Sequence, residues 1–122
     1  IAGPGSFELS NALMAADAKA AMRALSRSLS IGEPYALLPS IAWHLRRILT
    51  ARQQIARGVP LSQVLPRMPH QQRQAMTRLL SARPLSRVQA DVRAVLAADL
   101  AIKSGADAPG VLTRLVAVLC MP

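Results

Sequence analysis

The feature that most constrains the fold is the helical spacing of apolar residues near the middle of the chain. Between residues 34 and 57, five apolar side chains recur at intervals of three, four and seven positions: Leu38, Ile41, Leu45, Ile48 and Ile55. Such intervals place the side chains on one face of an α-helix. Polar residues recur on the opposite side: Arg46, Thr50, Gln53 and Arg57. The segment therefore predicts one long amphipathic helix, in which Pro39 kinks or delays the first turn and which Gly58 ends.

Similar patterns elsewhere predict six or seven helical segments in all, separated by Gly, Pro and Asp. The other segments are expected at about residues 6–16, 18–31, 61–65, 70–82, 86–104 and 107–119. Four residues are predicted to cap helix N-termini with their side chains: Ser6, Asp17, Ser86 and Asp107. A second apolar stripe, on the segment 86–104, contains Val88, Val92, Val95 and Ile102.

The composition supports an all-α chain. Hydrophobic residues make up 52% of it but aromatic residues only 2%, so the core must be built from Leu, Ile, Val, Ala and Met. No segment alternates as a half-buried strand would. We therefore expect a single compact bundle of about six helices, orthogonal or up-and-down. The domain is expected to cover residues 7–122, after a linker or expression remnant at residues 1–6, and to belong to a longer protein.

The chain is strongly basic, with a formal net charge of +9. Ten arginines and one acid, Asp91, lie between Arg46 and Arg93, so this stretch alone carries ten minus one, or +9. Such a balance is typical of proteins that bind nucleic acids or acidic surfaces. The simpler interpretation, which we favour, is a genome that prefers arginine, with the side chains on solvated helix faces. Aromatic stacking platforms, which single-strand binders use, are absent.

Neither catalysis nor a cofactor is expected. The sequence lacks a phosphate-binding P-loop, a G-x-S-x-G turn and an H-E-x-x-H motif. His44, His70 and Cys120 are too dispersed for a structural zinc site. Cys120 and His44 could in principle act as a nucleophile and its base. The stronger interpretation is that Cys120 is a small hydrophobic residue of the core. No apolar run reaches the roughly 20 residues that span a bilayer, no signal peptide is evident, and a single cysteine is consistent with the cytoplasm.

Two positions are candidates for contact with a partner. Trp43 is either a core residue or an interface anchor, since Trp is enriched at interface hot spots. Asp99 lies on the stripe of residues 86–104, where a charge is costly unless it is paired. It either forms only a surface pair with Lys103, four residues later, or faces a neighbouring domain or subunit.

Three segments resemble a known family. Phe7–Ala21 resembles the F-x-L-x-x-A-L-x-x-G-D-x-x-x-A start of the C-terminal collar domain of the delta subunit of the bacterial DNA polymerase III clamp loader. Ile41–Leu49 resembles its L-x-x-x-L-R-x-L-L helix, and Ala98–Gly105 resembles its A-D-x-A-I-K-G segment before the last helix. The order and spacing agree from Phe7 to the end of the chain. The sequence departs from the family in having Ala16 in place of Gly, and Pro39 in the long helix.

This resemblance implies a scaffold function without an enzyme activity of its own. Collar domains pack in a ring and hold together the pentamer that loads the sliding clamp onto primed DNA during replication. The implied partners are the ATPase subunit and the delta-prime subunit, with DNA contacts indirect or weak. The sliding clamp would be bound only through an N-terminal region outside this sequence, and DNA-directed DNA polymerase activity would belong to the holoenzyme. The candidate interface residues are Trp43, Arg46, Arg47, Asp99 and Lys103. The alternative function is that of a basic helical domain that binds nucleic acid directly.

Overall fold

The computed structural model describes residues 4–31, 34–65 and 67–121, and in these residues the only regular elements are helices. Seven are present there: α1 (Pro4–Met14), α2 (Ala18–Ser30), α3 (Pro34–Ala56), α4 (Leu61–Val64), α5 (His70–Ala82), α6 (Leu85–Lys103) and α7 (Ala108–Leu119). The predicted all-α class is confirmed. The seven helices of the described residues agree with the six or seven segments predicted, and the four-residue α4 falls within the short segment expected at residues 61–65.

The long helix α3 follows its apolar pattern. Leu38, Ile41, Leu45 and Ile48 are buried and Ile55 packs against the core, while the predicted polar face is exposed. Pro39 lies inside the helix without ending it, as predicted. Pro39 is the sixth residue of α3, so its missing N–H removes one hydrogen bond, to the carbonyl four residues earlier, and the rest of the helix continues.

Three helices end in the same hydrogen-bonded motif, in which one residue adopts a positive φ. That residue is Gly58 after α3 (φ 93°), Gly105 after α6 (φ 97°) and Ala16 after α1 (φ 53°). After α1, the Asp17 N–H donates to the carbonyl of Ala12 at 2.9 Å and the Ala16 N–H donates to that of Leu13 at 3.1 Å. This is the Schellman arrangement, which favours glycine at the left-handed position. Ala16 therefore occupies a position that favours glycine.

Two of the four predicted N-caps are confirmed. Asp17 accepts a hydrogen bond from the Ala20 N–H at 3.1 Å, and Asp107 accepts one from the Gly110 N–H at 3.0 Å. The other two predictions are wrong because both helices begin earlier, at a proline or just after one. Ser6 lies inside α1, which starts at Pro4, and Ser86 lies inside α6, whose N-cap is Pro84. Proline has a fixed φ suited to a helix start and no N–H to leave unsatisfied there. Residues 1–3 of the predicted linker lie outside the described residues.

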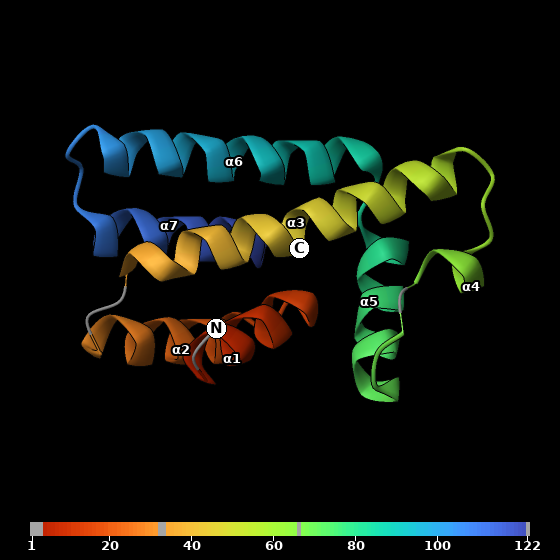
Figure 1. Ribbon diagram of the computed structural model, residues 1–122, viewed down its shortest axis with the longest axis horizontal. Coiled ribbons are helices and arrows are strands. Elements are labelled where there is room, and N and C mark those ends of the chain that lie inside the picture. The colour runs from red at the N-terminus through yellow and green to blue at the C-terminus, as the bar shows by residue number, and fades with distance from the viewer. Residues whose placement is uncertain (1–3, 32–33, 66, 122) are drawn as a thin grey trace.

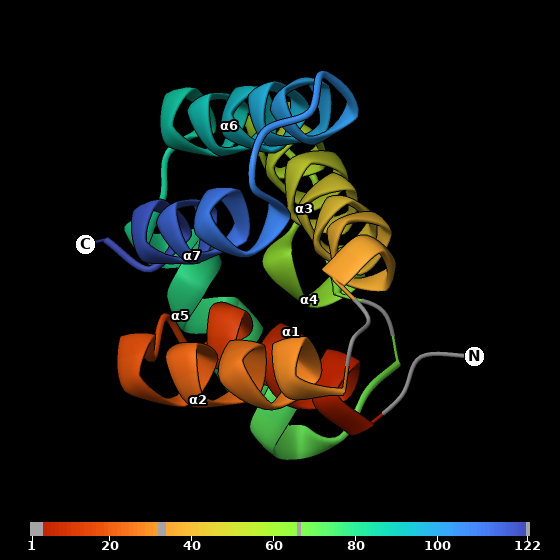
Figure 2. The ribbon, with the colours of Figure 1, turned by 90° about the vertical axis from the view of Figure 1, so that its left-hand side faces the viewer.

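The helices are arranged in layers around α3 (Figure 1). α6 and α7 form an antiparallel pair along one side of α3. The hairpin of α1 and α2 packs against α7 on the side that faces away from α6 (Figure 2). α5 runs across the direction of these helices and contacts both α1 and α3, while α4 contacts the end of α3.

The core lies where the long helices meet, and in the described residues it is aliphatic. Its most deeply buried large side chains come from six of the helices: Leu9, Leu25, Leu37, Ile41, Met76, Leu80, Val88, Leu112 and Val116. Such a core fixes the positions of α3 and α6 relative to each other. These two helices carry the five candidate interface residues.

Candidate protein-interaction surfaces

The five predicted interface residues divide between two surfaces. Trp43, Arg46 and Arg47 line an open groove beside α3. Asp99 and Lys103 lie on the last turns of α6 and pair with each other. The structure does not gather the five residues into one site.

Trp43 is on the surface, with 55% of the residue exposed. The guanidinium carbon of Arg47, one turn further along α3, lies 4.6 Å from the centroid of the indole. This is a cation–π contact, worth about 0.5–1 kcal/mol at an exposed site. The interpretation of Trp43 as a core residue is therefore wrong. An indole ring held in place on the surface is a suitable anchor for a partner.

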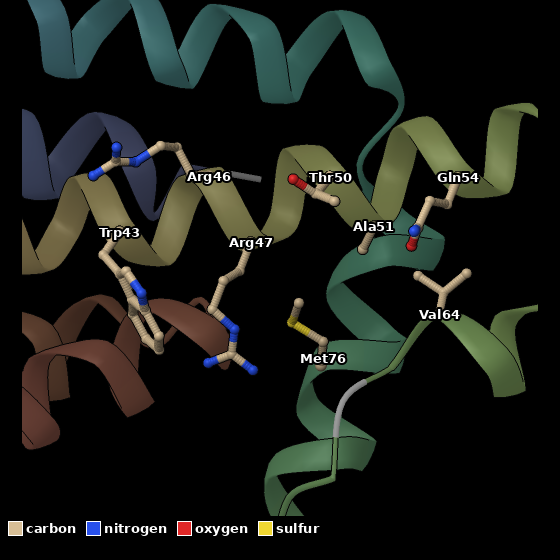
Figure 3. Close-up of a pocket in the computed structure, with 8 residues that line it drawn as sticks. All are labelled: Trp43, Arg46, Arg47, Thr50, Ala51, Gln54, Val64 and Met76. Atoms are coloured by element: carbon tan, nitrogen blue, oxygen red, sulfur yellow. The ribbon is translucent and has the colours of Figure 1, made fainter.

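The groove beside α3 has a volume of about 490 Å³ and is formed by α3, α4 and α5 (Figure 3). We call it the α3 groove and define it by its lining residues: Trp43, Arg46, Arg47, Thr50, Ala51, Gln54, Val64 and Met76. In Figure 3, Trp43 and Arg47 extend from the same side of α3, whereas Arg46 leaves the helix on the other side, at the rim.

A second surface follows the outer side of α6. Leu96 and Leu100, one turn apart, are 62% and 67% exposed. Beside them Lys103 Nζ donates to Asp99 Oδ2 at 2.9 Å. We call Leu96, Asp99, Leu100 and Lys103 the α6 ridge. Asp99 thus forms the predicted surface pair, which alone would be worth little. Exposed leucines framed by charges resemble the apolar centre and polar rim of a protein interface.

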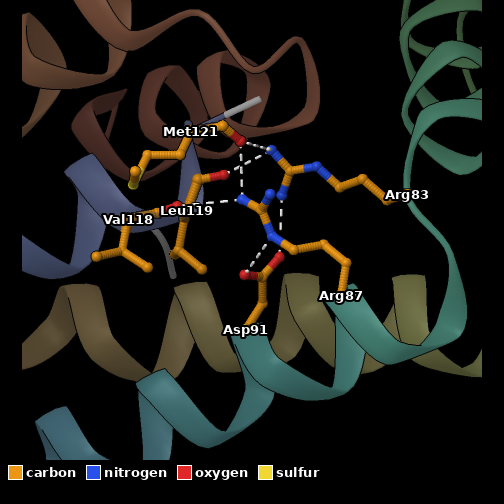
Figure 4. A network of polar contacts seen from close by, with 6 residues as sticks. All are labelled: Arg83, Arg87, Asp91, Val118, Leu119 and Met121. Carbon is orange, nitrogen blue, oxygen red and sulfur yellow. Dashed lines mark hydrogen bonds and ion pairs between the residues drawn. The ribbon is translucent and has the colours of Figure 1, made fainter.

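The structure also contains a buried charge cluster that the sequence analysis did not identify (Figure 4). Asp91, only 2% exposed, accepts from Arg83 Nη1 at 2.9 Å and from Arg87 Nε at 3.0 Å. Arg83 Nη2 also donates to the Leu119 carbonyl at 2.7 Å, and Arg87 Nη2 donates to the Met121 carbonyl at 2.8 Å. We call Arg83, Arg87 and Asp91 the C-terminal clasp, because Asp91 holds the two arginines that donate to the carbonyls at the end of α7.

The clasp could have been found only in part from the sequence. Arg87 and Asp91 have the i, i+4 spacing of a helical ion pair. Nothing in the sequence shows that Arg83, which precedes α6, folds back to share the same carboxylate. Burial, followed by the charge of Arg87, lowers the pKa of Arg83, whereas Asp91 acts to raise it. The clasp is a structural ion cluster that holds the end of α7 in place.

Two reactive residue types are in the core. His44 is buried, its Nε2 has no hydrogen-bond partner, and its pKa falls to about 4 because of burial and the charges of Arg47 and Arg83. Its imidazole is neutral at pH 7. Cys120 is buried as predicted, and burial raises the pKa of its thiol, which disfavours the reactive thiolate.

Neither a metal centre nor a membrane span is found in the described parts of the chain. Residues 4–31, 34–65 and 67–121 contain no group of three or more His, Cys, Asp or Glu side chains placed to hold a metal ion. Within the same residues, no helix combines the length and apolar character needed to cross a bilayer.

The fold places this chain in the class of all-α helical bundles, with two exposed surfaces on α3 and α6. Comparison with protein-family models gives no match. Comparison with curated proteins gives no significant match either. The residues themselves must therefore support any assignment of function.

Proposed function

We propose that this chain is an oligomerisation domain, the collar of a clamp-loader delta subunit, and that it works in the cytoplasm without catalysing a reaction. The observation that carries the proposal is the α6 ridge. Leu96 and Leu100 present apolar surface to solvent at a place where the core does not need them. A subunit interface of standard size buries roughly 800 Å² per partner around such anchors.

The position of the ridge supports the proposal further. The Ala98–Gly105 segment, which resembles the collar family, includes Asp99, Leu100 and Lys103 of the ridge. In this arrangement Leu96 and Leu100 would enter the apolar centre of the contact, and the Asp99–Lys103 pair would lie at its rim. The proposed neighbours are the ATPase subunit and the delta-prime subunit, and the proposed result is a pentamer that loads the sliding clamp during replication.

The test is a binding assay with the 122-residue chain immobilised at physiological salt. Purified ATPase subunit or delta-prime subunit from the same organism is passed over it, and the retained amount is measured. We expect retention of at least one of them, reduced about tenfold or more by the double substitution Leu96→Glu and Leu100→Glu, because two carboxylates would then have to be desolvated in the contact.

The matched control is Ile31→Glu, which changes another exposed apolar residue, 71% exposed and outside α6. It should leave retention within about twofold, because an exposed side chain outside the contact adds little to binding energy. Circular dichroism should show that both variants remain helical. Failure of the wild-type chain to retain either subunit would contradict the proposal, and so would equal retention by the ridge variant.

Direct binding of nucleic acid is the second candidate, and it is favoured by the distribution of charge. Five arginines of the basic stretch are exposed: Arg46, Arg57, Arg67, Arg78 and Arg93. If these contact phosphates, an electrophoretic shift with duplex DNA should weaken steeply as salt is raised. A shift at physiological salt without retention of the clamp-loader subunits would favour this function over the first.

A further inference from the structure

The α3 groove follows one face of a helix over about three turns. Trp43, Arg47, Thr50 and Gln54 are separated by four, three and four residues, so their side chains leave α3 in the same general direction. Eleven residues of helix rise by about 16 Å. A chain segment lying along the groove would therefore contribute about five residues if extended or about eleven if helical.

The two ends of the groove differ in chemistry. At one end Arg46 and Arg47 supply positive charge beside the exposed indole of Trp43. At the other end the lining is apolar and includes two buried residues, Ala51 at 4% exposure and Met76 at 2%, together with the partly buried Val64. Thr50 lies between these ends, and Gln54, the last groove residue along α3, adds one polar side chain at the apolar end, beside Val64.

The positive end is not balanced by a carboxylate in the groove lining. The five acids in the described part of the chain make contacts elsewhere. Glu8 pairs with Arg27 at 2.9 Å, Asp91 belongs to the C-terminal clasp, and Asp99 pairs with Lys103. Asp17 and Asp107 cap α2 and α7. The groove is therefore complementary to a ligand that brings negative charge to one end and an apolar group to the other.

We propose that the α3 groove binds a short acidic peptide segment of a partner protein. Carboxylates of the segment would pair with Arg47, while Arg46 adds positive charge at the rim, and one apolar side chain would lie over Ala51, Val64 and Met76. Guanidinium groups bind carboxylates through charge-assisted hydrogen bonds, and the apolar contact would fix the direction of the segment. This inference goes beyond the proposed function, because it concerns a different surface from the α6 ridge.

The groove suits a peptide better than single-stranded nucleic acid. A single strand is bound by successive stacking platforms along a positive track. Here one indole is present, Arg47 already lies over its ring, and the lining becomes apolar towards Met76. A bound strand would place its charged backbone along that apolar end, whereas an acidic peptide can place a leucine or phenylalanine there.

The experiment uses Trp43 as the reporter, because it is the only tryptophan of the chain. The probe is a blocked twelve-residue peptide of glutamate and leucine, with leucine at helical spacing. Its addition to the 122-residue chain should change the tryptophan emission saturably. Fluorescence anisotropy of a labelled copy of the peptide gives the affinity independently of any change in the surroundings of Trp43.

Two variants test the two ends of the groove. Arg47→Glu should weaken peptide binding about tenfold or more, because it replaces attraction by repulsion. Val64→Asp should weaken it about fivefold or more by placing a charge at the apolar end. The matched control Arg114→Glu changes an exposed arginine of α7 outside the groove, and it should leave the affinity within about twofold. Helicity by circular dichroism identifies any variant that fails to fold.

Comparison probes define the outcomes that overturn the inference. A peptide with lysine in place of glutamate, and a twelve-nucleotide thymidine strand, should each bind at least about tenfold more weakly than the acidic peptide. If the thymidine strand bound more tightly than the acidic peptide, the ligand of the α3 groove would be a nucleic acid and not a peptide. If Arg47→Glu and Arg114→Glu reduced the affinity for the acidic peptide equally, the peptide would be attracted only by the net charge of the chain and not by the groove. The variant Leu96→Glu with Leu100→Glu should bind the peptide normally, so this test and that of the subunit interface fail independently.

Discussion

At the scale of single residues, His44 makes the stability of the protein depend on pH. Its pKa is about 4 in the folded state and about 6.5 when unfolded. Above pH 6.5 the imidazole is neutral in both states, so stability is unaffected. As the pH falls from 6.5 towards 4, the unfolded state binds the proton first and folding is progressively disfavoured. The loss should reach about 2 kcal/mol at pH 5.

Urea unfolding at pH 7 and pH 5 measures this effect. His44→Leu removes both the titrating group and the unpartnered Nε2 atom, so its free energy of unfolding should change less between the two pH values than that of the wild type. The control is His70→Gln, which removes the exposed histidine and should keep the wild-type pH dependence. If His44→Leu lost as much stability on acidification as the wild type, the low pKa of His44 would not be the cause.

Ala16 holds a backbone conformation that favours glycine. Its φ of 53° lies in the left-handed region, which costs a residue with a Cβ about 1–2 kcal/mol. Glycine loses more entropy on folding, which offsets part of this gain. We therefore expect Ala16→Gly to raise the free energy of unfolding by about 0.5–1 kcal/mol, measured by urea unfolding. Ala15→Gly, one residue earlier and without a positive φ, should not stabilise the protein; a gain there too would contradict the explanation.

At the scale of elements, the C-terminal clasp joins the start of α6 to the end of α7. Asp91→Ala would leave Arg83, itself 8% exposed, buried without its carboxylate. Breaking a buried pair in this way typically costs about 3–5 kcal/mol. Thermal and urea unfolding should show a loss of that order. Asp99→Ala breaks only the exposed pair with Lys103 and should change stability by less than about 1 kcal/mol.

A double-mutant cycle separates the ion pair from the capping of α7. Arg83→Met alone removes the donor to the Leu119 carbonyl as well as the pair with Asp91. If the charges are coupled, Arg83→Met with Asp91→Leu should destabilise the protein less than the sum of the single changes, by about 1 kcal/mol or more. Additive losses would show that Asp91 does not act through Arg83.

The helices could be predicted from the sequence because their signals are local. The spacing of Leu38, Ile41, Leu45 and Ile48 determines the buried face of α3, and the positive φ of Gly58 and Gly105 ends two helices where expected. The starts of α1 and α6 differ from the prediction because each helix begins at or just after a proline, whereas the pattern favours the nearby serine as the cap. The clasp depends on the contact of Arg83 with the carbonyl of Leu119 at the end of α7, and these two residues are 36 positions apart in the sequence. No local pattern encodes such a contact.

The sequence predicts individual residues of the candidate surfaces, but it does not predict which residues from different helices come together in one site. Helical spacing predicts Arg46 and Thr50 on the polar side of α3, but the α3 groove also needs Val64 and Met76, which α4 and α5 bring from other parts of the chain. The sequence does not predict the exposure of Leu96 and Leu100 either. Their positions fall outside the apolar stripe of α6, and a leucine outside a stripe gives no signal until the packing of the helix is known.

At the scale of the whole molecule, a net charge of +9 on 122 residues disfavours the folded state through repulsion among like charges. Salt screens repulsion between exposed charges, with a Debye length of about 10 Å at 0.1 M. It also weakens the exposed pairs Glu8–Arg27 and Asp99–Lys103, but such pairs contribute little. The repulsion should dominate, so the midpoint of thermal unfolding should rise by a few degrees between 20 mM and 300 mM sodium chloride.

An acidic ligand of the α3 groove should stabilise the protein under the conditions in which this repulsion is strongest. A ligand that binds only the folded state raises the free energy of unfolding in proportion to the logarithm of its concentration above Kd. The glutamate–leucine peptide should therefore raise the unfolding midpoint at low salt, and Arg47→Glu should remove most of that rise. Raising the salt should reduce the peptide's effect while increasing the stability of the free chain. If salt changed the unfolding midpoint of the free chain and of the peptide-bound chain by the same amount, the groove arginines would not bind the carboxylates of the peptide.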